Sequence, residues 1–351
     1  MLPKKITFLG SIILLQSLSL VTIWSTAESL FLTQLSFVVA GALLILFLSK
    51  IDLTFLFSLS NLWYFGSIFL LLLTFLVGKN IRGSVRWIDL GLFNLQTSEI
   101  VKPMLALFYV DYLCKYSLKG YKDILKFLGI ALVPVFLIAK QPDLGSALTL
   151  LFLPLILLIF KGHFAKLFIL GLLSLLVLVP LELKFLKPYQ RQRLETFINP
   201  YRDPRGSGYN VIQSTIAVGS GGFLGKGVRL GTQSHLNFLP ERHTDFIFAS
   251  FVEEFGLLGS LVLVSGFLVY SQMALTVYRK SSEENGGLLA LSVLGLVGFQ
   301  TVVNIGMNIG LMPVTGITLP FFSYGGSSLL SFSILSGLLL RQLDLLPPLE
   351  I

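Results

Sequence analysis

Apolar residues form long uninterrupted runs along most of this chain, and short polar segments separate the runs. A transmembrane helix needs roughly 20 apolar residues to cross about 30 Å of hydrocarbon. Runs of suitable length fall at 6–24, 30–49, 53–77, 98–114, 124–140, 144–160, 164–181, 243–278, 288–311 and 320–340. This pattern predicts an all-α polytopic membrane protein with about ten transmembrane helices, in a single domain over residues 1–351.

The eighth run, residues 243–278, is longer than one straight crossing requires. An unbroken helix there would be over about 50 Å long at 1.5 Å per residue. Gly256 and Gly259 lie in this run, and glycine is a common site of helix kinks. We therefore expect the helix to bend or end at one of these two residues.

The composition supports a lipid-embedded chain, since 54% of its residues are hydrophobic and 13% are charged. Soluble domains have roughly 45–50% apolar and about 25% charged residues. The net charge of +8 does not indicate a nucleic-acid partner, because no basic block stands in a soluble domain. Cys114 is the only cysteine, so no intrachain disulfide forms. Residues 1–27 resemble a signal peptide, but the long apolar run and the span that follows favour an uncleaved first helix.

The distribution of basic residues predicts the orientation, because short cytoplasmic segments are rich in Lys and Arg. With the N-terminus in the cytoplasm, inner segments hold 12 of the 26 basic residues, namely Lys4, Lys5, Lys50, Lys115, Lys119, Lys122, Lys126, Lys161, Lys166, Arg279, Lys280 and Arg341. The opposite orientation would place these residues in short outer segments. We therefore predict cytoplasmic N- and C-termini and one long extracytoplasmic loop, about 181–242, between helices 7 and 8.

This outer loop carries nine basic and four acidic residues and a cluster of glycines between 219 and 231. Loops of this length are usually functional, although a flexible solvated loop is the simpler alternative. The apolar stretch Val211–Val218 and the aromatic residues of the loop favour short amphipathic helices on the membrane surface.

The glycine cluster does not form a phosphate-binding P-loop. Ser220 stands where that motif needs its first glycine, and Gly227 follows Lys226 where Ser or Thr is required. An anion-binding nest of backbone amides, with Lys226 and Arg229 beside it, remains a weaker interpretation. The three histidines and one cysteine have no zinc-site spacing.

The polar segment 239–245 joins this loop to the eighth helix and ends in Asp245. Pro240 suits a first helical turn, which would place Asp245 near a helix N-terminus at the outer edge of the hydrocarbon. The helix dipole favours its ionised form and nearby lipid disfavours it. Such a carboxylate could act as a general base near neutral pH. The structural alternative is that Asp245 caps the helix or pairs with Arg242 or His243.

Charged residues also occur inside the predicted spans. Glu99 and Lys102 are three residues apart, so they share one helix face and could pair. Glu253 and Glu254 lie deeper in the eighth span, where charges mark either a functional cavity or a structural ion pair.

Asn304 and Asn308 lie four apart in the ninth span, a spacing more typical of hydrogen bonds between helices than of substrate binding. Pro320 and Gly325 precede the tenth helix and indicate a broken backbone there, which a membrane tolerates only against protein or a wet cavity. Together with segments 82–88 and 141–143, these polar motifs all map to the outer face.

In combination, these motifs resemble the shape, elongation, division and sporulation (SEDS) family of bacterial peptidoglycan glycosyltransferases. The resemblance spans about residues 82–341 and rests on segments 82–88, 96–102, 141–146, 219–233, 239–248 and 319–328. Gly-Thr-Gln at 231–233 and Pro-Val-Thr-Gly at 313–316 look more like the rod-shape member that acts in cell elongation than the division member. One departure is Thr97, where the family usually has proline.

This resemblance implies polymerisation of lipid II, the undecaprenyl-pyrophosphate-linked disaccharide-pentapeptide, into β-1,4 glycan strands. The reaction would occur at the outer face of the bacterial cytoplasmic membrane during cell elongation. The family's essential aspartate falls on Asp245, its cavity glutamate and lysine on Glu99 and Lys102, and its outer-loop tryptophan on Trp87. The implied partners are the growing strand, a class B penicillin-binding protein and other membrane proteins of the elongation complex, with no nucleic acid.

Glycoside hydrolases use two carboxylates, because the leaving sugar oxygen must be protonated. A pyrophosphate is already a good leaving group, so this reaction needs only one base. Asp245 would take the proton from the 4-hydroxyl of the acceptor sugar, and nearby cations would stabilise the departing oxygens. The further candidate substrate-binding residues are Arg86, Asp143, Arg193, Lys226, Arg229, Gln233, His243 and Ser323. A divalent cation, Mg²⁺ or Mn²⁺, could share this role, and no other cofactor is indicated.

Two other functions are consistent with the sequence. Charges inside spans also suit a flippase or transporter of the lipid-linked precursor. However, the halves show no repeat of the kind that many transporters have, and motifs on one face suit one-sided chemistry better. A non-catalytic scaffold of the elongation machinery is the third hypothesis.

Overall fold

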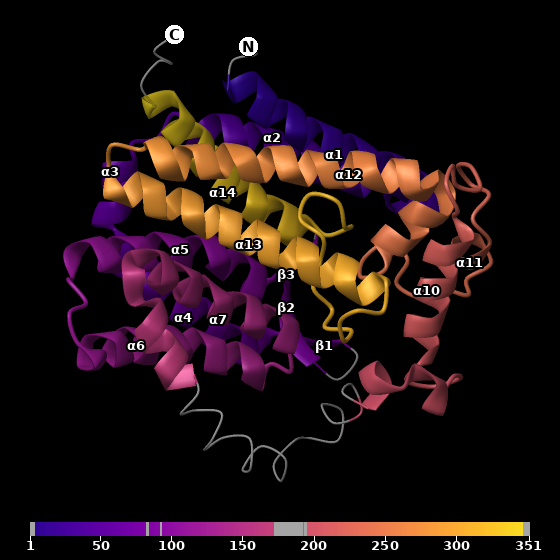
Figure 1. Ribbon diagram of the computed structural model, residues 1–351, viewed down its shortest axis with the longest axis horizontal. Helices are drawn as coiled ribbons and strands as arrows, with labels where there is room; N and C mark the ends of the chain where they lie inside the picture. The colour runs from indigo at the N-terminus through magenta and orange to yellow at the C-terminus, as the bar shows by residue number, and fades with distance from the viewer. Residues whose placement is uncertain (1–3, 82–83, 92, 172–191, 193–194, 347–351) are drawn as a thin grey trace.

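The computed structural model describes residues 4–81, 84–91, 93–171, 192 and 195–346, and it is mainly helical (Figure 1). The longer helices are α1 (Lys4–Thr26), α2 (Phe31–Leu48), α4 (Ser60–Val77), α5 (Thr97–Lys115), α6 (Tyr121–Lys140), α7 (Leu144–Leu158), α10 (Tyr209–Ser220), α12 (Ile247–Lys280), α13 (Glu284–Asn308) and α14 (Gly326–Leu345). The short ones are α3 (Leu53–Ser58) and α11 (Thr232–His235), with 3-10 turns at Glu28–Leu30 and Pro200–Arg202 and a π-helical turn at Ile159–His163.

Seven of the described helices are long and apolar enough to span a membrane, which makes the chain a multi-pass membrane protein as predicted. Helices α5 and α6 have 19 and 20 residues, but each carries four charged residues. The stretch 144–171 is interrupted at Gly162, which has a left-handed φ of 84°. Because residues 172–191 lie outside the described part, the seventh span at 164–181 and the total of ten spans stay predictions.

Ion pairs at the helix ends show which segments lie at the same end of the bundle. Lys5 near the start of α1 pairs with Asp344 near the end of α14. Lys161, after α7, pairs with Glu284 at the start of α13. Figure 1 shows α10 and α11 beyond the other end of the bundle, at the start of α12. This arrangement agrees with an even number of crossings and a loop region opposite the termini.

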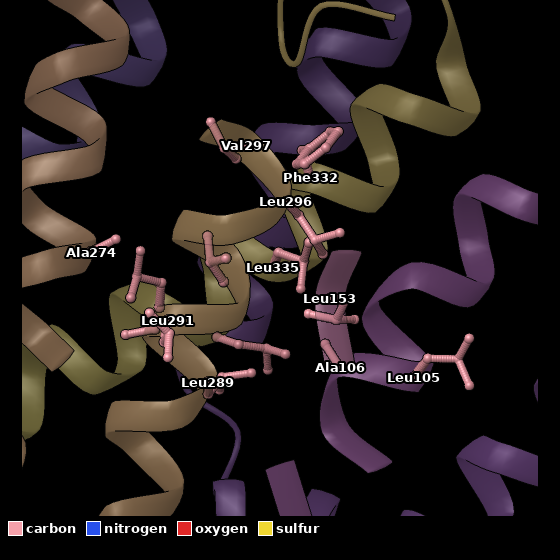
Figure 2. Close-up of a cluster of buried hydrophobic side chains, with 14 of the residues drawn as sticks. Leu105, Ala106, Leu153, Ala274, Leu289, Leu291, Leu296, Val297, Phe332 and Leu335 are labelled. Carbon is pink, nitrogen blue, oxygen red and sulfur yellow. The ribbon is translucent and has the colours of Figure 1, made fainter. Parts of the chain in front are cut away.

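Helices α13 and α14 are the most buried of the described spans, at 67% and 72%, whereas only 17% of α2 is buried. Figure 2 shows side chains of α13 packed among residues of four neighbouring helices, including Leu105 of α5, Leu153 of α7, Ala274 of α12 and Phe332 of α14. Lipid tails are as apolar as leucine, so such bundles depend on close packing and buried polar contacts between helices.

A small antiparallel sheet is an addition to the predicted helices. Strands β1 (Lys79–Ile81), β2 (Ser84–Asp89) and β3 (Asn94–Gln96) pair in the order β1-β2-β3. Trp87 on the central strand pairs with Lys79 and Gln96. Valine, tryptophan and isoleucine favour strands, so β2 is locally reasonable. The sheet connects α4 to α5 and carries the polar segment 84–88 to the cavity described below.

Helix α5 begins at Thr97, the position where the resemblance leads one to expect proline. Its hydroxyl lies 2.8 Å from the hydroxyl of Thr74 on α4. Proline suits a first helical position because no amide hydrogen bond is lost there. The threonine keeps the same helix start and adds a contact between α4 and α5.

Helix α12 breaks at Gly256, as predicted, where φ is 65° and ψ is −162°. A break frees backbone groups that a continuous helix would have paired. The amide of Leu257 donates to the carbonyl of Gly222 at 2.9 Å, and the carbonyls of Glu253 and Glu254 accept from the loop segment 226–227, also at 2.9 Å. The glycine-rich loop therefore supplies the hydrogen bonds that the broken helix lacks.

The prediction of an anion-binding nest in this loop is wrong for its three central amides. Those of Gly225, Lys226 and Gly227 donate to backbone carbonyls of Gly221, Glu253 and Glu254. A Cβ atom on Gly225 would lie 2.1 Å from the carbonyl oxygen of Glu254. The glycines thus allow the loop backbone to approach α12 closely.

The outer loop contains the short helices that were predicted for it. Helix α10 covers the apolar stretch 211–218 and buries Val211, Ser214 and Ala217. The prediction for Pro240 is wrong, because it lies in a turn and α12 begins only at Ile247.

Candidate functional site

A cavity of about 620 Å³ lies between the sheet, the segment before α12 and the start of α14. This volume is typical of small-molecule sites. The described residues of its lining combine two carboxylates, one guanidinium, several aromatic rings and many hydroxyl and amide groups, contributed by Thr33, Phe37, Arg86, Trp87, Phe93, Asn94, Gln96, Glu241, Thr244, Asp245, Gly316, Thr318, Tyr324, Gly325, Gly326, Ser327 and Ser328. Three predicted site residues, Arg86, Trp87 and Asp245, therefore meet in one cavity.

Asp245 lies two residues before the first residue of α12, close to the predicted helix N-terminus. A Cβ atom built on Gly316 would be 3.7 Å from Oδ2 of Asp245. Gly316 has a φ of 73°, a conformation that glycine adopts without steric cost. The Asp245 carboxylate thus lies beside Gly316, where the backbone carries no side chain that would clash with it.

Among the described residues, Arg86 is the one basic residue in the cavity lining. Its guanidinium carbon lies 4.2 Å from the ring centre of Trp87, and Nη1 lies 3.7 Å from Oδ1 of Asp143. Its Nε has no hydrogen-bond partner among the described residues. Two neighbours, Trp87 and Asp143, therefore orient the planar cation beside the cavity.

Asp143 was predicted to bind substrate, but it lies behind Arg86 and does not line the cavity. It is almost fully buried and caps α7 by accepting from the amide of Ser146 at 3.1 Å. It also accepts from Gln96 Nε2 at 3.0 Å and from the Ser98 hydroxyl at 3.2 Å. These contacts hold the carboxylate in place beside the guanidinium.

Glu241 is a second carboxylate in the cavity that the site prediction did not include. Its left-handed backbone, with φ of 51°, makes a turn in which its carbonyl accepts from the amides of Thr244 and Phe246 at 3.1 and 3.2 Å. The Thr244 hydroxyl lies 3.1 Å from Oε2 of Glu241. The sequence did offer one indication that Glu241 belongs to the site, because it lies four residues before Asp245 in the same polar segment.

Ser323 and His243, both predicted site residues, join two segments of the cavity wall without lining the cavity. The Ser323 hydroxyl donates to the carbonyl of Thr244 at 2.8 Å, and the amide of Tyr324 donates to the carbonyl of His243 at 2.9 Å. Tyr324 does line the cavity, and burial raises the pKa of its phenol. The phenol therefore stays protonated at neutral pH and can donate a hydrogen bond.

Glu99 and Lys102 form the predicted pair, with 2.6 Å between Oε1 and Nζ. Both side chains are buried, and Lys102 Nζ lies 5.6 Å from the ring centre of Phe332. The pair follows Gln96 by one helical turn but is not part of the cavity lining. A buried pair of this kind needs both partners, because either charge alone would be strongly destabilising.

The basic residues of the glycine-rich loop are not brought to the cavity. Lys226 Nζ binds Glu253 at 2.8 Å. The Arg229 guanidinium binds Glu28 at 2.8 Å and stacks 4.1 Å from the ring centre of Trp24. Their charges are thus compensated away from Asp245.

Gln233 belongs to the same region, since its backbone amide donates to Glu253 Oε1 at 2.9 Å. Glu253 therefore forms a structural ion pair with Lys226, and Oε1 of Glu254 lies 2.9 Å from Nε2 of His235. Both partners belong to the outer loop and not, as expected, to another spanning helix. Arg193, the remaining predicted residue, lies outside the described residues. Among the residues that are described, no group of three or more His, Cys, Asp or Glu side chains forms a metal site.

Comparisons with known proteins identify relatives of this chain. The model of the FtsW/RodA/SpoVE family, described as cell cycle protein, matches residues 3–344. The peptidoglycan glycosyltransferase MrdB of Escherichia coli K12 is 40% identical over 276 residues, 76% of this chain and 73% of that protein. The probable peptidoglycan glycosyltransferase FtsW of Pseudoalteromonas translucida is 40% identical over 286 residues, 78% of this chain and 69% of that protein.

Two solved structures share the fold along nearly the whole chain. One is a chain from a peptidoglycan synthase complex that coordinates polymerization and crosslinking, with a TM-score of 0.84, 34% identity and 96% of both chains covered. The other is the rod shape determining protein RodA of Thermus thermophilus, with a TM-score of 0.73, 27% identity, and 97% of this chain and 96% of that chain covered.

Proposed function

This chain belongs to the FtsW/RodA/SpoVE cell cycle protein family, and from that premise we propose that it is a peptidoglycan glycosyltransferase. Its substrate in this proposal is lipid II, which it polymerises into β-1,4 glycan strands. The reaction takes place at the outer face of the bacterial cytoplasmic membrane during cell elongation. The observation that supports it best is the single cavity in which Asp245, Arg86 and Trp87 meet.

Asp245 acts as the general base in this proposal. It accepts the proton of the acceptor 4-hydroxyl while that oxygen forms the new bond to the anomeric carbon of the donor sugar. The bond from that carbon to the pyrophosphate breaks, and the electron pair leaves with the phosphate oxygen. The configuration at the donor carbon therefore inverts from α to β.

Arg86 takes the role of stabilising the pyrophosphate, for which several loop residues were also candidates. Charge-assisted hydrogen bonds from a positioned guanidinium stabilise oxygens on which negative charge develops. The place of Arg86 in the cavity lining supports this assignment, whereas Lys226 and Arg229 are engaged with acidic residues elsewhere. Trp87 offers a flat apolar face to a sugar ring.

A divalent cation, Mg²⁺ or Mn²⁺, remains part of the proposal. Mg²⁺ is usually bound by one or two carboxylates together with substrate phosphates. Glu241 and Asp245 provide two carboxylates in the cavity lining, so the donor set fits such an ion. The cation would neutralise pyrophosphate charge. Synthesis lost in EDTA and restored by added Mg²⁺ would support it, and unchanged synthesis in EDTA would exclude it.

The first prediction concerns Asp245. In an assay of purified protein with fluorescent lipid II, Asp245→Asn is expected to abolish glycan synthesis, because an amide cannot accept the proton. Asp89→Asn is the matched control, since Asp89 is a carboxylate of the neighbouring sheet that pairs with Lys79 and does not line the cavity. Normal synthesis by Asp245→Asn would falsify the general-base assignment.

Transport of the precursor is not favoured. The intramembrane carboxylates that suggested it are engaged in pairs, Glu99 with Lys102 and Glu253 with Lys226. Proteoliposomes that translocate lipid II without forming polymer would reverse this conclusion. A polymer made by the isolated chain would likewise exclude a purely scaffolding role.

A further inference from the structure

The C-terminal end of α13 carries two asparagines, Asn304 and Asn308, whose side chains are completely buried. They lie one helical turn apart and face the segment that leads into α12. The expectation that they hydrogen-bond between structural elements is confirmed. Their partner is the backbone of Asp245, the general base of the proposed function.

Both asparagines bind the same carbonyl oxygen. Nδ2 of Asn304 lies 3.2 Å from the carbonyl oxygen of Asp245, and Nδ2 of Asn308 lies 3.0 Å from it. Oδ1 of Asn308 in turn accepts from the amide of Ala249 at 3.0 Å. The carboxamide of Asn308 therefore bridges two backbone groups of the neighbouring chain segment.

The two backbone groups that Asn308 bridges have the spacing of hydrogen-bond partners within an α-helix. Residues 245 and 249 are four apart, so their carbonyl and amide would bond directly if α12 began one turn earlier. A side chain inserted into this pattern of hydrogen bonds opens the helix locally. Consistent with this, Phe246 has non-helical angles, φ −108° and ψ 22°, and α12 begins at Ile247. Asp245 is thereby kept just outside the helix.

Asn304 connects the same point to the opposite wall of the cavity. Its Nδ2 also donates to the carbonyl of Ile317 at 2.7 Å. Ile317 lies between Gly316 and Thr318, both of which line the cavity, and Gly316 faces the Asp245 carboxylate. One buried amide group thus links the two backbone segments between which the carboxylate sits.

We propose that Asn304 and Asn308 are positioning residues for glycan synthesis, which hold the Asp245 carboxylate at the cavity by binding its backbone carbonyl and opening the first turn of α12. This inference rests on the proposed function, because it takes Asp245 to be the base. The two asparagines do not line the cavity and act only through Asp245. A general base must lie within hydrogen-bond reach of its proton, so a small displacement is costly.

The test compares four variants in the full-length protein with fluorescent lipid II. Asn308→Leu keeps the number and branching of the side-chain heavy atoms and removes the bridge. Asn304→Ser is a milder change, since a buried serine can satisfy its hydroxyl against its own helix. Gln300→Leu is the matched control, because Gln300 is a buried polar residue one turn earlier on α13 that does not line the cavity. Asp245→Asn reports on the proposed function itself.

We expect Asn308→Leu and Asn304→Ser to lower kcat by roughly tenfold to 100-fold. The KM for lipid II should change little, because Arg86 and Trp87 remain in place. The acid limb of the pH profile of kcat should also shift, since it reports the protonation of the base in its surroundings. Gln300→Leu should leave kcat and the pH profile unchanged.

A fall in activity that only follows the folded fraction, with an unshifted pH profile, would overturn the proposal and leave the asparagines as helix contacts. Wild-type kcat in both asparagine variants would overturn it as well. If these variants behave normally while Asp245→Asn is inactive, the positioning role fails and the proposed function stands. Normal synthesis by Asp245→Asn would instead reject the proposed function.

Discussion

At the scale of single residues, the site depends on which charges face the cavity and which are compensated elsewhere. Arg86 and Lys226 are both basic residues of outer segments, but only Arg86 lines the cavity. Its orientation depends on contacts with Trp87 and Asp143. A guanidinium and an ammonium are not equivalent here, because only the former is planar, stacks on an aromatic ring and donates in a fixed fork.

Arg86 therefore leads to a prediction that separates charge from shape. Arg86→Ala is expected to lower kcat/KM for lipid II by roughly 100-fold or more, as for loss of one transition-state donor. Arg86→Lys should recover only part of this loss, since the ammonium cannot reproduce the stacked, bidentate geometry.

Lys79→Met provides the control for Arg86, because Lys79 is an exposed base on the same sheet that pairs with Asp89. It should retain the rate of the unmodified protein in the lipid II assay. Equal rates for Arg86→Lys and the unmodified protein would show that charge alone matters. An unaffected Arg86→Ala variant would remove the residue from the mechanism.

At the scale of secondary-structure elements, the broken helix α12 and the glycine-rich loop depend on each other. The break at Gly256 leaves backbone groups unpaired, and the loop pairs them. Glu253 and Glu254 then bind Lys226 and His235 of the same loop. The loop is thus part of the support for α12, the helix that follows Asp245.

Two glycines of this loop allow a matched stability test. Gly225 and Gly222 both have left-handed φ angles, 84° and 57°, so alanine at either costs roughly 1–2 kcal/mol in backbone strain. A Cβ atom on Gly225 would also lie 2.1 Å from the Glu254 carbonyl oxygen, whereas one on Gly222 would meet nothing within 4 Å. Gly225→Ala should therefore lower the thermal midpoint clearly more than Gly222→Ala. Equal shifts in a thermal unfolding assay would contradict the packing role of this loop.

At the scale of the whole molecule, the described helices form a bundle in which α13 and α14 are the most buried spans, with the cavity at the start of α14. The least buried spans, α2 and α4, present apolar side chains to their surroundings, as lipid-facing helices do. The structural similarity to a chain of a peptidoglycan synthase complex supports the proposal of a transpeptidase partner. We propose that this partner, a class B penicillin-binding protein, contacts the bundle through a transmembrane segment.

The partner proposal predicts a rate effect. Adding the full-length transpeptidase to this protein in the lipid II assay should increase glycan synthesis, because contacts within the membrane would stabilise the active arrangement of the bundle. The transpeptidase domain without its transmembrane segment is the control and should have a smaller effect. Full synthesis by the isolated chain, with no change on addition of either form, would rule out partner dependence.

The amino-acid sequence by itself determined the membrane character of the chain, the location of most helices and the position of Asp245 close to the start of a span. These features follow from local properties: the length of apolar runs, the spacing of Glu99 and Lys102 on one helix face, and a carboxylate at the start of a span. The break at Gly256 was also predictable, because its run is too long for one straight helix.

Only the tertiary structure decided which residues share the cavity. Arg86, Glu241 and Tyr324 come from three separate segments, and their meeting depends on how a sheet, a turn and a broken helix start pack together. The ion pairs of the loop bases Lys226 and Arg229 could not be predicted, because their acidic partners, Glu253 and Glu28, are distant in the sequence. The role of Asn308 could not be predicted for the same reason. Its spacing from Asn304 indicates a hydrogen bond, but only the folded chain shows that the bond is made to the backbone carbonyl of Asp245.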